Sequence, residues 1–244
     1  MTKLVVADFD GTLLPYGMKT VSDKVIAYIK FLISHGVAFA VASGRTYSEL
    51  SVLLSDVKDD IYFICDDGAV ALKNGKVIFR KPFAPVSLSY FFDTDLFRNV
   101  TMYSLDKAYL IGDVARPVLY GKTPRRIQRH IEIKDEIYKV CANVKCFDLV
   151  DTAHHRIHYS DKDFAEFVSF YANKGVAVGD LQLKLGVSKF ETVVIGDADN
   201  DIPMTLHARQ SWAIGDRSDR LKGRSTDFAE KIETAFDAIT NNII

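Results

Sequence analysis

Two aspartates, separated by one residue, stand near the start of the chain where an apolar run ends. Residues 4–12 read Leu-Val-Val-Ala-Asp-Phe-Asp-Gly-Thr, so Gly11 follows Asp8 and Asp10 and permits a sharp turn. Two carboxylates this close disfavour each other's charged form, which is typical of a site that holds a metal ion or a phosphate group. Because residues i and i+2 of a strand point to the same side, both carboxylates can face one crevice.

A second acidic group occurs near the C-terminal end, where residues 196–201 read Gly-Asp-Ala-Asp-Asn-Asp. This group also follows a short apolar run, and Asp197 and Asp201 are its candidates for a site shared with the first pair. Three or four carboxyl groups around one point form a hard oxygen site. Mg²⁺ is the expected ion, because it also keeps waters and phosphate oxygens as ligands.

Two further residues suit a phosphoryl group. Ser43 precedes Gly44 where a helix is expected to begin, and the free backbone N–H groups of a helix start favour an anion. Lys174 opens another expected helix and supplies a point charge for phosphate. A carboxylate can attack phosphorus to form an aspartyl phosphate, and a second can protonate the leaving oxygen and later accept a proton from water. The pair Asp8 and Asp10 would divide into nucleophile and acid/base.

The elements that must position these residues are short apolar runs that each end in a polar residue beside glycine. The runs lie at 4–7, 37–42, 61–65, 193–195 and 212–214. Helix-like stretches lie between or after them, at 22–36, 46–54, 175–185, 200–208 and 226–239. Apolar runs without alternation suit strands that are buried on both faces. The pattern therefore predicts a doubly wound, Rossmann-like α/β parallel sheet, in which ligands bind beyond the carboxyl ends of the strands.

This alternation of strands and helices stops after residue 72. An Asn-Gly turn predicts a β-hairpin over 69–79, and shorter alternating segments follow it, at 109–111, 137–140 and 147–150. A hairpin is expected over 156–171 and a helix after Pro124. We therefore predict an inserted α+β domain at 83–171, between the two parts of the core at 1–82 and 172–244.

Four ordered motifs, at residues 8–12, 43–45, 174–175 and 196–201, resemble those of the haloacid dehalogenase superfamily. Their spacing is similar to that of the Cof-type sugar-phosphate phosphatases, in which an α/β cap lies between the second and third motifs. The chain departs from these relatives at Asp67 and Asp216, where they often have asparagine. Both changes would add negative charge near a phosphate site.

The resemblance implies a role for each matching residue. Asp8 would be the nucleophile and Asp10 the acid/base, while Ser43 and Lys174 would hold the transferring phosphoryl group. Contacts with the phosphate or the substrate are implied for Gly11, Gly44, Arg45 and Asn200, although Arg45 can equally form a surface ion pair. The implied Mg²⁺ ligands are Asp8, Asp10 through its backbone carbonyl, and Asp197, with Asp201 as a ligand or a supporting group.

The expected function is a Mg²⁺-dependent phosphatase that acts on small phosphate monoesters, with sugar phosphates as the leading class. A phosphosugar mutase and a non-catalytic phosphosugar-sensing module are the alternatives. The substrate class rests on the resemblance, because a core fold alone does not select a substrate.

Charge and composition limit the possible partners. The 31 basic and 32 acidic residues nearly cancel, so no overall field favours nucleic acid or a membrane surface. No leader precedes the first strand, no apolar run approaches ~18 residues, and three cysteines lack C-x-x-C spacing, so we expect a cytoplasmic protein with reduced thiols. The expected partner is a small phosphate ester, and the expected state is a monomer or homodimer.

Three other patterns are weaker. Residues 121–123 read Gly-Lys-Thr but lack the glycine that a phosphate-binding loop needs five residues earlier. His154, His155 and His158 lack the spacing of a zinc protease, so a zinc site is the minority interpretation. The basic cluster at 125–130 is read as a solvated helix face, with a lid contact for an anionic substrate as the alternative.

Overall fold

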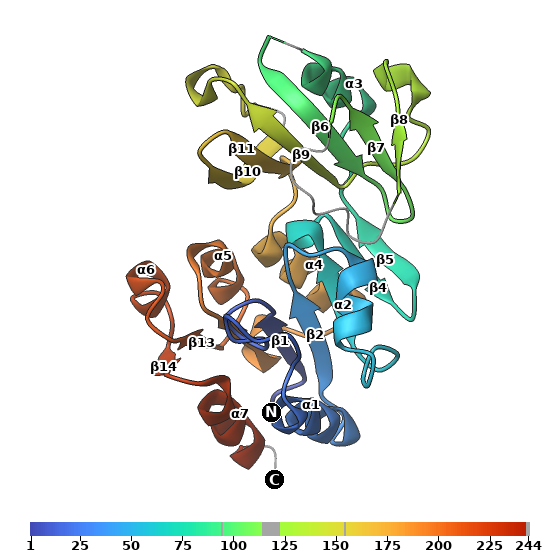
Figure 1. Ribbon diagram of the computed structural model, residues 1–244. Coiled ribbons are helices and arrows are strands. Elements are labelled where there is room, and N and C mark those ends of the chain that lie inside the picture. Colours follow the sequence, from blue (N-terminus) through green and yellow to red (C-terminus); the bar gives the residue numbers. More distant parts are fainter. Residues whose placement is uncertain (94, 114–122, 154, 243–244) are drawn as a thin grey trace.

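Two β-sheets, one above the other in Figure 1, contain the strands of the structure. The computed structural model describes residues 1–93, 95–113, 123–153 and 155–242. Eight strands form the lower sheet and six form the upper sheet, and both labelled chain ends lie in the lower part of the molecule.

The eight-stranded sheet is the core sheet, with the order β14-β13-β12-β1-β2-β3-β4-β5. Its strands are β1 (Leu4–Asp8), β2 (Ala38–Ala42), β3 (Tyr62–Cys65), β4 (Val70–Lys73), β5 (Lys76–Arg80), β12 (Thr192–Gly196), β13 (Gln210–Ile214) and β14 (Asp227–Ala229). From β14 to β3 the neighbours are parallel, whereas β4 and β5 add the antiparallel hairpin that the Asn-Gly turn predicts.

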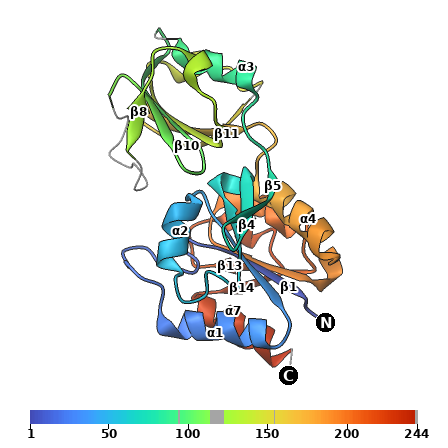
Figure 2. The same cartoon turned by 90° about the vertical axis from the view of Figure 1, so that its right-hand side faces the viewer.

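Helices cover both faces of the core sheet. They are α1 (Asp23–Ser34), α2 (Tyr47–Leu53), α4 (Lys174–Leu185), α5 (Ile202–Thr205), α6 (Asp219–Lys222) and α7 (Ile232–Asn241), with 3-10 turns η1 (Asp66–Gly68), η5 (Lys189–Glu191) and η6 (Asp199–Asp201). Figure 2 shows α1 and α7 together on one side of the sheet and α4 on the other. Val5 and Ala7 of β1 pack on the side of α1 and α7, and Leu4 and Val6 pack on the side of α4. This double burial explains the continuous apolar run.

The core sheet has a topological switch point at β1. One edge of β1 pairs with β2, and the other pairs with β12, which comes much later in the sequence. Where the chain leaves two neighbouring parallel strands toward opposite sides of the sheet, a crevice forms beyond the carboxyl ends of these strands. Asp8 ends β1 and Asp197 directly follows β12, so the two predicted acidic groups meet at this edge.

The six-stranded sheet, with the order β10-β11-β9-β6-β7-β8, is the cap sheet. Its strands are β6 (Phe97–Tyr103), β7 (Ala108–Ile111), β8 (Pro124–Arg126), β9 (Lys139–Val144), β10 (His155–Asp161) and β11 (Phe164–Ser169), accompanied by α3 (Pro85–Leu88) and the 3-10 turns η2 (Ser89–Phe92), η3 (His130–Glu132) and η4 (Phe147–Leu149). All of these elements lie within the range 83–171 that the sequence assigns to an insertion, although the boundaries themselves stay predictions.

Three local predictions are wrong. The helix expected after Pro124 is instead β8, because this segment pairs in parallel with β7. The strand expected at 147–150 is the single turn η4. The helix expected over 226–239 begins later, at Ile232, because residues 227–229 extend the core sheet as β14. In each case the secondary structure that forms depends on contacts with neighbouring elements, and a local sequence pattern carries no information about those contacts.

Among the described residues, no helix combines the length and the apolar character needed to cross a membrane.

Gly175 provides a test of how α4 is seated. A Cβ atom on Gly175 would lie 2.4 Å from the backbone oxygen of Pro203 in α5, so the two helices approach too closely for any side chain. We expect Gly175→Ala to lower the free energy of unfolding by about 1–3 kcal/mol in urea denaturation, because overpacking outweighs the better helix propensity of alanine. The matched control is Gly223→Ala, where the nearest atom would lie at an ordinary 3.4 Å. Equal stability of the two variants would contradict this close packing.

Candidate active site

Polar residues at the carboxyl edge of the core sheet line a cavity of about 420 Å³. The sequence-predicted residues among them are Asp8, Asp10, Ser43, Gly44, Arg45, Lys174, Asp197 and Asn200. The cap sheet contributes His158 and Tyr159 from β10 and Glu166 from β11. The structure thus brings the predicted residues of all four motifs together, under a wall that the cap provides.

Lys174 forms the centre of the charged groups in this cavity. Its Nζ atom lies 2.5 Å from Asp8 Oδ1 and 2.6 Å from Asp201 Oδ1, and all three side chains are buried. Asn173 positions the lysine by capping α4, because its side chain accepts a hydrogen bond from the Val176 N–H. The first residue of α4 therefore joins the end of β1 to the loop after β12.

Asp201 fixes the loop after β12 through its other oxygen. Oδ2 accepts hydrogen bonds from the backbone N–H groups of Asp197, at 3.0 Å, and Ala198, at 3.1 Å. Asp8, Asp197 and Asp201 each present a carboxylate oxygen, and these oxygens lie within 4.8 Å of one another. Hard oxygen donors in this arrangement suit a divalent cation such as Mg²⁺.

The buried charges alter one another's protonation. Burial and the charge of Asp201 raise the pKa of Asp8 well above its ordinary value. The same two causes raise the pKa of Asp197 to about 6. Burial alone would lower the pKa of Lys174, but the carboxylates of Asp201 and Asp8 raise it above its ordinary value, so the lysine is cationic at neutral pH. One ammonium group does not balance three carboxylates, and this imbalance favours a further cation.

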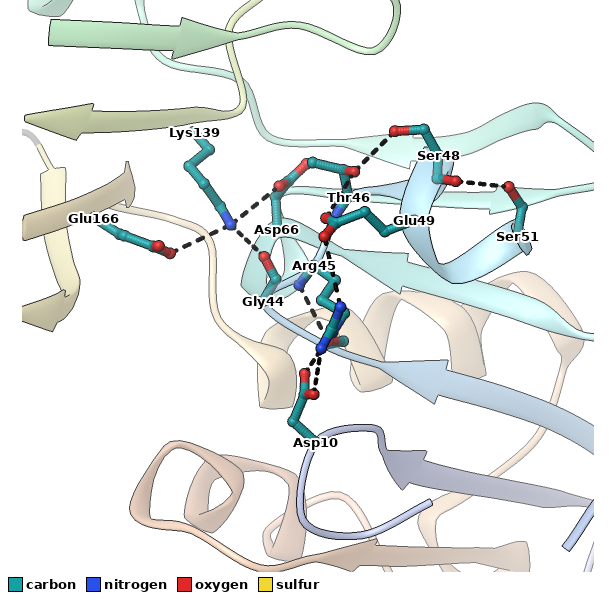
Figure 3. A network of polar contacts seen from close by, with 11 residues as sticks. Asp10, Gly44, Arg45, Thr46, Ser48, Glu49, Ser51, Asp66, Lys139 and Glu166 are labelled. Atoms are coloured by element: carbon teal, nitrogen blue, oxygen red, sulfur yellow. Dashed lines mark hydrogen bonds and ion pairs between the residues drawn. The ribbon is translucent and has the colours of Figure 1, made fainter. Parts of the chain in front are cut away.

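Asp10 lies on the open side of the cavity, where Arg45 holds it (Figure 3). Arg45 donates from Nε to Asp10 Oδ2 and from a terminal nitrogen to Asp10 Oδ1, each at 2.8 Å. A second terminal nitrogen of Arg45 lies 3.6 Å from Glu49. The bidentate geometry fixes the Asp10 carboxylate more firmly than a single contact would. Arg45, for which the sequence leaves two interpretations open, therefore forms an ion pair within the site.

The loop after β2 differs from its predicted form. The following helix α2 begins at Tyr47 with Thr46 as its cap, so Ser43 lies before the helix start and does not open it. Ser43 is buried, and its Oγ atom accepts a hydrogen bond from the Arg45 N–H at 3.1 Å. The hydroxyl hydrogen of Ser43 is still available to donate to a phosphoryl oxygen.

Gly11 and Asn200 border the site in different ways. Gly11 has a φ of +87°, and a Cβ atom there would lie 2.3 Å from Asp197 Oδ2, so only glycine fits this turn. Asn200 is exposed at the rim of the cavity, one residue before Asp201.

The sequence analysis did not identify two residues outside the cap, Tyr16 and Arg217, that contact the acidic residues of the site. The Tyr16 hydroxyl donates to Asp197 Oδ2 at 2.8 Å, and its oxygen also lies 3.3 Å from the Asp10 backbone carbonyl oxygen. The Arg217 guanidinium lies 4.7 Å from the centre of the Tyr16 ring and 3.8 Å from Asp197. The position of Arg217, just after the strand ending Gly-Asp at 215–216, could have revealed it as a further strand-end residue.

The cap residues beside the cavity were also missed. Lys139 of β9 is buried and donates to the Gly44 carbonyl, and its Nζ atom lies 3.4 Å from Glu166 and 3.6 Å from Asp66 (Figure 3). His158 had entered the sequence analysis only as a possible zinc ligand. In the structure its Nδ1 atom lies 2.7 Å from Asp67.

The two departures from the Cof-type pattern have different positions. Asp67 is buried at the junction of core and cap, whereas Asp216 is exposed and pairs with Lys222. Of the weaker motifs, His154 and residues 121–122 lie outside the described residues. Among the described residues, the acids Asp8, Asp197 and Asp201 form the metal-compatible group.

Comparison with known proteins identifies a family and several relatives that this chain resembles. A family model described as haloacid dehalogenase-like hydrolase matches residues 5–243. The 5-amino-6-(5-phospho-D-ribitylamino)uracil phosphatase of Escherichia coli (strain K12) is 23% identical over 232 residues, which are 87% of this chain and 84% of that protein. The HMP-PP phosphatase of Klebsiella pneumoniae (strain 342) is 23% identical over 246 residues, covering 91% of this chain and 87% of its own length.

Solved structures share the fold at low identity. A sugar phosphatase of haloacid dehalogenase subclass IIB has a TM-score of 0.80 at 18% identity, with 100% of both chains covered. A phosphatase of the same superfamily from Bacteroides thetaiotaomicron has a TM-score of 0.79 at 20% identity, with 100% of this chain and 96% of that chain covered. These likenesses confirm the Rossmann-like core with a cap that the sequence predicts.

Because the family model spans nearly the whole chain, this protein belongs to the haloacid dehalogenase-like hydrolases.

Asp197 provides a test of the charge imbalance in the metal-free protein. Folding raises the pKa of the Asp197 carboxyl group from 3.8 to about 6, so the folded state binds this proton more tightly than the unfolded state. The resulting contribution to stability is complete below pH 3.8 and is lost as the pH rises through 6. Without divalent cations, Asp197→Asn should therefore increase the free energy of unfolding at pH 7.5, by about 1–3 kcal/mol. At pH 4.5 the gain should shrink, because most of the wild-type carboxyl is then protonated. Urea denaturation in a chelator measures both values.

The matched control is Asp199→Asn, two residues away. Asp199 is half-exposed, and a hydrogen bond from Ser218 and the positive charge of Arg220 lower its pKa. Replacing this carboxylate with a neutral amide should therefore not increase the free energy of unfolding at either pH. An Asp197→Asn variant that is less stable than wild type at pH 7.5 would show that the carboxylates are balanced without a metal.

Proposed function

We propose that the protein is a Mg²⁺-dependent phosphatase that hydrolyses small phosphate monoesters, with sugar phosphates as the preferred class, through an aspartyl-phosphate intermediate. The enzyme is a phosphoric monoester hydrolase, as its family and its curated relatives indicate. The finer proposal rests on one observation. The buried carboxylate of Asp8 is held by Lys174 in the same cavity as the accessible carboxylate of Asp10.

The relatives support a small phosphorylated substrate. One acts on a phosphoribitylamino-uracil and another on HMP-PP, and one structural neighbour is a sugar phosphatase. A cytoplasmic location and a monomeric or homodimeric state stay predictions from the sequence.

The residues at the site fit Mg²⁺. Both oxygens of Asp201 already accept hydrogen bonds, one of them from Lys174, so we assign direct binding to Asp8, Asp197 and the Asp10 carbonyl, with Asp201 as support. Such an ion, when bound, neutralises charge on the transferring phosphoryl oxygens.

In the first step, Asp8 attacks phosphorus with one carboxylate oxygen. The bond between phosphorus and the ester oxygen breaks, and Asp10, in the state in which one of its oxygens carries a proton in place of its contact with Arg45, donates that proton to the departing oxygen. Lys174 and Ser43 hold phosphoryl oxygens, so that the attacking and leaving oxygens stay in line. Arg45 keeps Asp10 at the mouth of the cavity, where a leaving group has to pass.

In the second step, water replaces the leaving group and attacks the same phosphorus. Asp10, now ionised, accepts a proton from this water, and the bond between phosphorus and Asp8 breaks to release phosphate. The Asp8 carboxylate is restored, and Lys174 again balances part of its charge.

The nucleophile provides the direct test. Asp8→Asn should lower phosphate release at least ~1,000-fold, because an amide cannot attack phosphorus. The assay is phosphate release from sugar, nucleotide and cofactor phosphates with Mg²⁺, with Asp199→Asn as the control that should retain activity. Equal background rates for wild type and Asp8→Asn over the whole panel would instead favour a sensing module. With a hexose phosphate and a bisphosphate activator, isomer formed without free phosphate would indicate a mutase.

The metal provides a separate test. Chelation should abolish phosphate release and added Mg²⁺ should restore it. Asp197→Asn should raise the Mg²⁺ concentration for half-maximal activity by about tenfold or more, because one charged oxygen ligand is lost. Titration of Mg²⁺ into chelator-treated protein measures this value. Undiminished activity after chelation would rule out the metal-dependent mechanism.

A further inference from the structure

His158 and Asp67 form a polar pair that joins the cap sheet to the core sheet. His158 lies on β10 of the cap, and Asp67 lies in the turn η1 that follows β3 of the core. Their side chains meet with Nδ1 of the histidine 2.7 Å from Oδ2 of the aspartate. Neither partner belongs to the four motifs that assign the phosphatase chemistry.

The histidine ring lies against the loop that follows β2. A Cβ atom on Gly44 would lie 2.9 Å from His158 Nε2, so the ring occupies the space that any side chain at position 44 would need. His158 also lines the cavity together with Ser43 and Lys174. Its Nε2 atom therefore lies beside Gly44, in the wall of the cavity that Ser43 and Lys174 also line.

The charge of Asp67 sets which ring nitrogen faces the substrate. Burial alone would raise the pKa of Asp67, but His158, Lys174 and Lys139 lower it below its ordinary value. The ionised carboxylate, 2.7 Å from His158 Nδ1, favours a proton on that nitrogen. This leaves Nε2 to interact with a group in the cavity.

The two walls of the cavity attract different parts of a phosphate ester. The core wall carries Lys174 and Ser43, which suit phosphoryl oxygens. The cap wall carries Tyr159 and the carboxylate of Glu166, which lies 3.4 Å from Lys139 Nζ and can accept hydrogen bonds from hydroxyl groups. A bound ester is therefore oriented with phosphorus at the core and its leaving group at the cap.

We infer that His158, oriented by Asp67, hydrogen-bonds a hydroxyl group on the leaving group near the phosphate, and so selects polyol and sugar phosphates. This inference rests on the proposed phosphatase function and deepens it. His158 contacts the substrate, whereas Asp67 is a positioning residue that acts through the histidine. Because the pair joins two sheets, the contact exists only while the cap covers the core.

The test compares glycerol 3-phosphate with propyl phosphate, which lacks the hydroxyl groups, using the full chain with Mg²⁺. The measured quantity is the ratio of kcat/KM for the two esters. His158→Ala should lower this ratio about tenfold, the loss that corresponds to one hydrogen bond of about 1.4 kcal/mol. Ser160→Ala, an exposed change on the same strand, should leave the ratio unchanged.

Asp67→Asn tests the positioning role, since asparagine also tolerates the positive φ of 53° found there. It should lower the ratio by less than His158→Ala, and the double variant should have the ratio of His158→Ala alone, because both changes act through one contact.

An equal loss for both esters in His158→Ala would overturn the inference, because His158 would then serve the phosphoryl group or the fold. Additive effects of the two changes would overturn the positioning role of Asp67. If wild type released phosphate from neither these esters nor the wider panel, the proposed function itself would fail, and this pattern is distinct from an altered ratio.

Discussion

The buried ammonium group of Lys174 is the interaction on which the site depends. It lies between Asp8 and Asp201, two buried carboxylates that would otherwise repel each other. Isolated charges are costly to bury, but a cation shared by two anions recovers much of that cost. The lysine also joins three segments that are remote in the sequence, since it connects the end of β1 and the start of α4 with the loop after β12.

The fold supplies this cluster with a rigid frame. Strands β1 and β12 are neighbours in the sheet, so the aspartates that follow them approach each other without any long loop. The same loops carry an excess of negative charge, which is unfavourable without a bound cation and would attract the proposed Mg²⁺. Stability and catalysis are therefore in opposition at the carboxyl edge of the sheet, as is common at active sites.

The sequence predicts the core chemistry because that chemistry follows strand ends. Asp8, Ser43 and Asp197 each stand just after an apolar run, and a parallel sheet necessarily brings such positions to one edge. Contacts made by long side chains from other elements have no such local signal. Tyr16 reaches Asp197 and His158 reaches Asp67 across the tertiary structure, and the local sequence predicts neither contact.

The cap was harder to predict for a related reason. The segment 124–126 has no strong strand pattern and becomes β8 because β7 offers it an unpaired edge. Residues 147–150 alternate like a strand, yet form a 3-10 turn beside the aromatic core of the cap. Local sequence decides less in such small sheets, where each short segment depends on the partner it finds.

The return of the chain from cap to core has a mechanical consequence. The last cap strand ends at Ser169 and the helix that carries the buried lysine begins at Lys174, so residues 170–173 are the whole connection. Asn173, the last of them, caps that helix, and its backbone lies so close to Gly68 that a Cβ there would overlap it. A displacement of the cap would therefore act on the first residue of α4 through this connection, as well as on the core residues that His158 and Lys139 contact directly. Residues 170–173 thereby couple the position of the cap to the position of the Lys174 ammonium group.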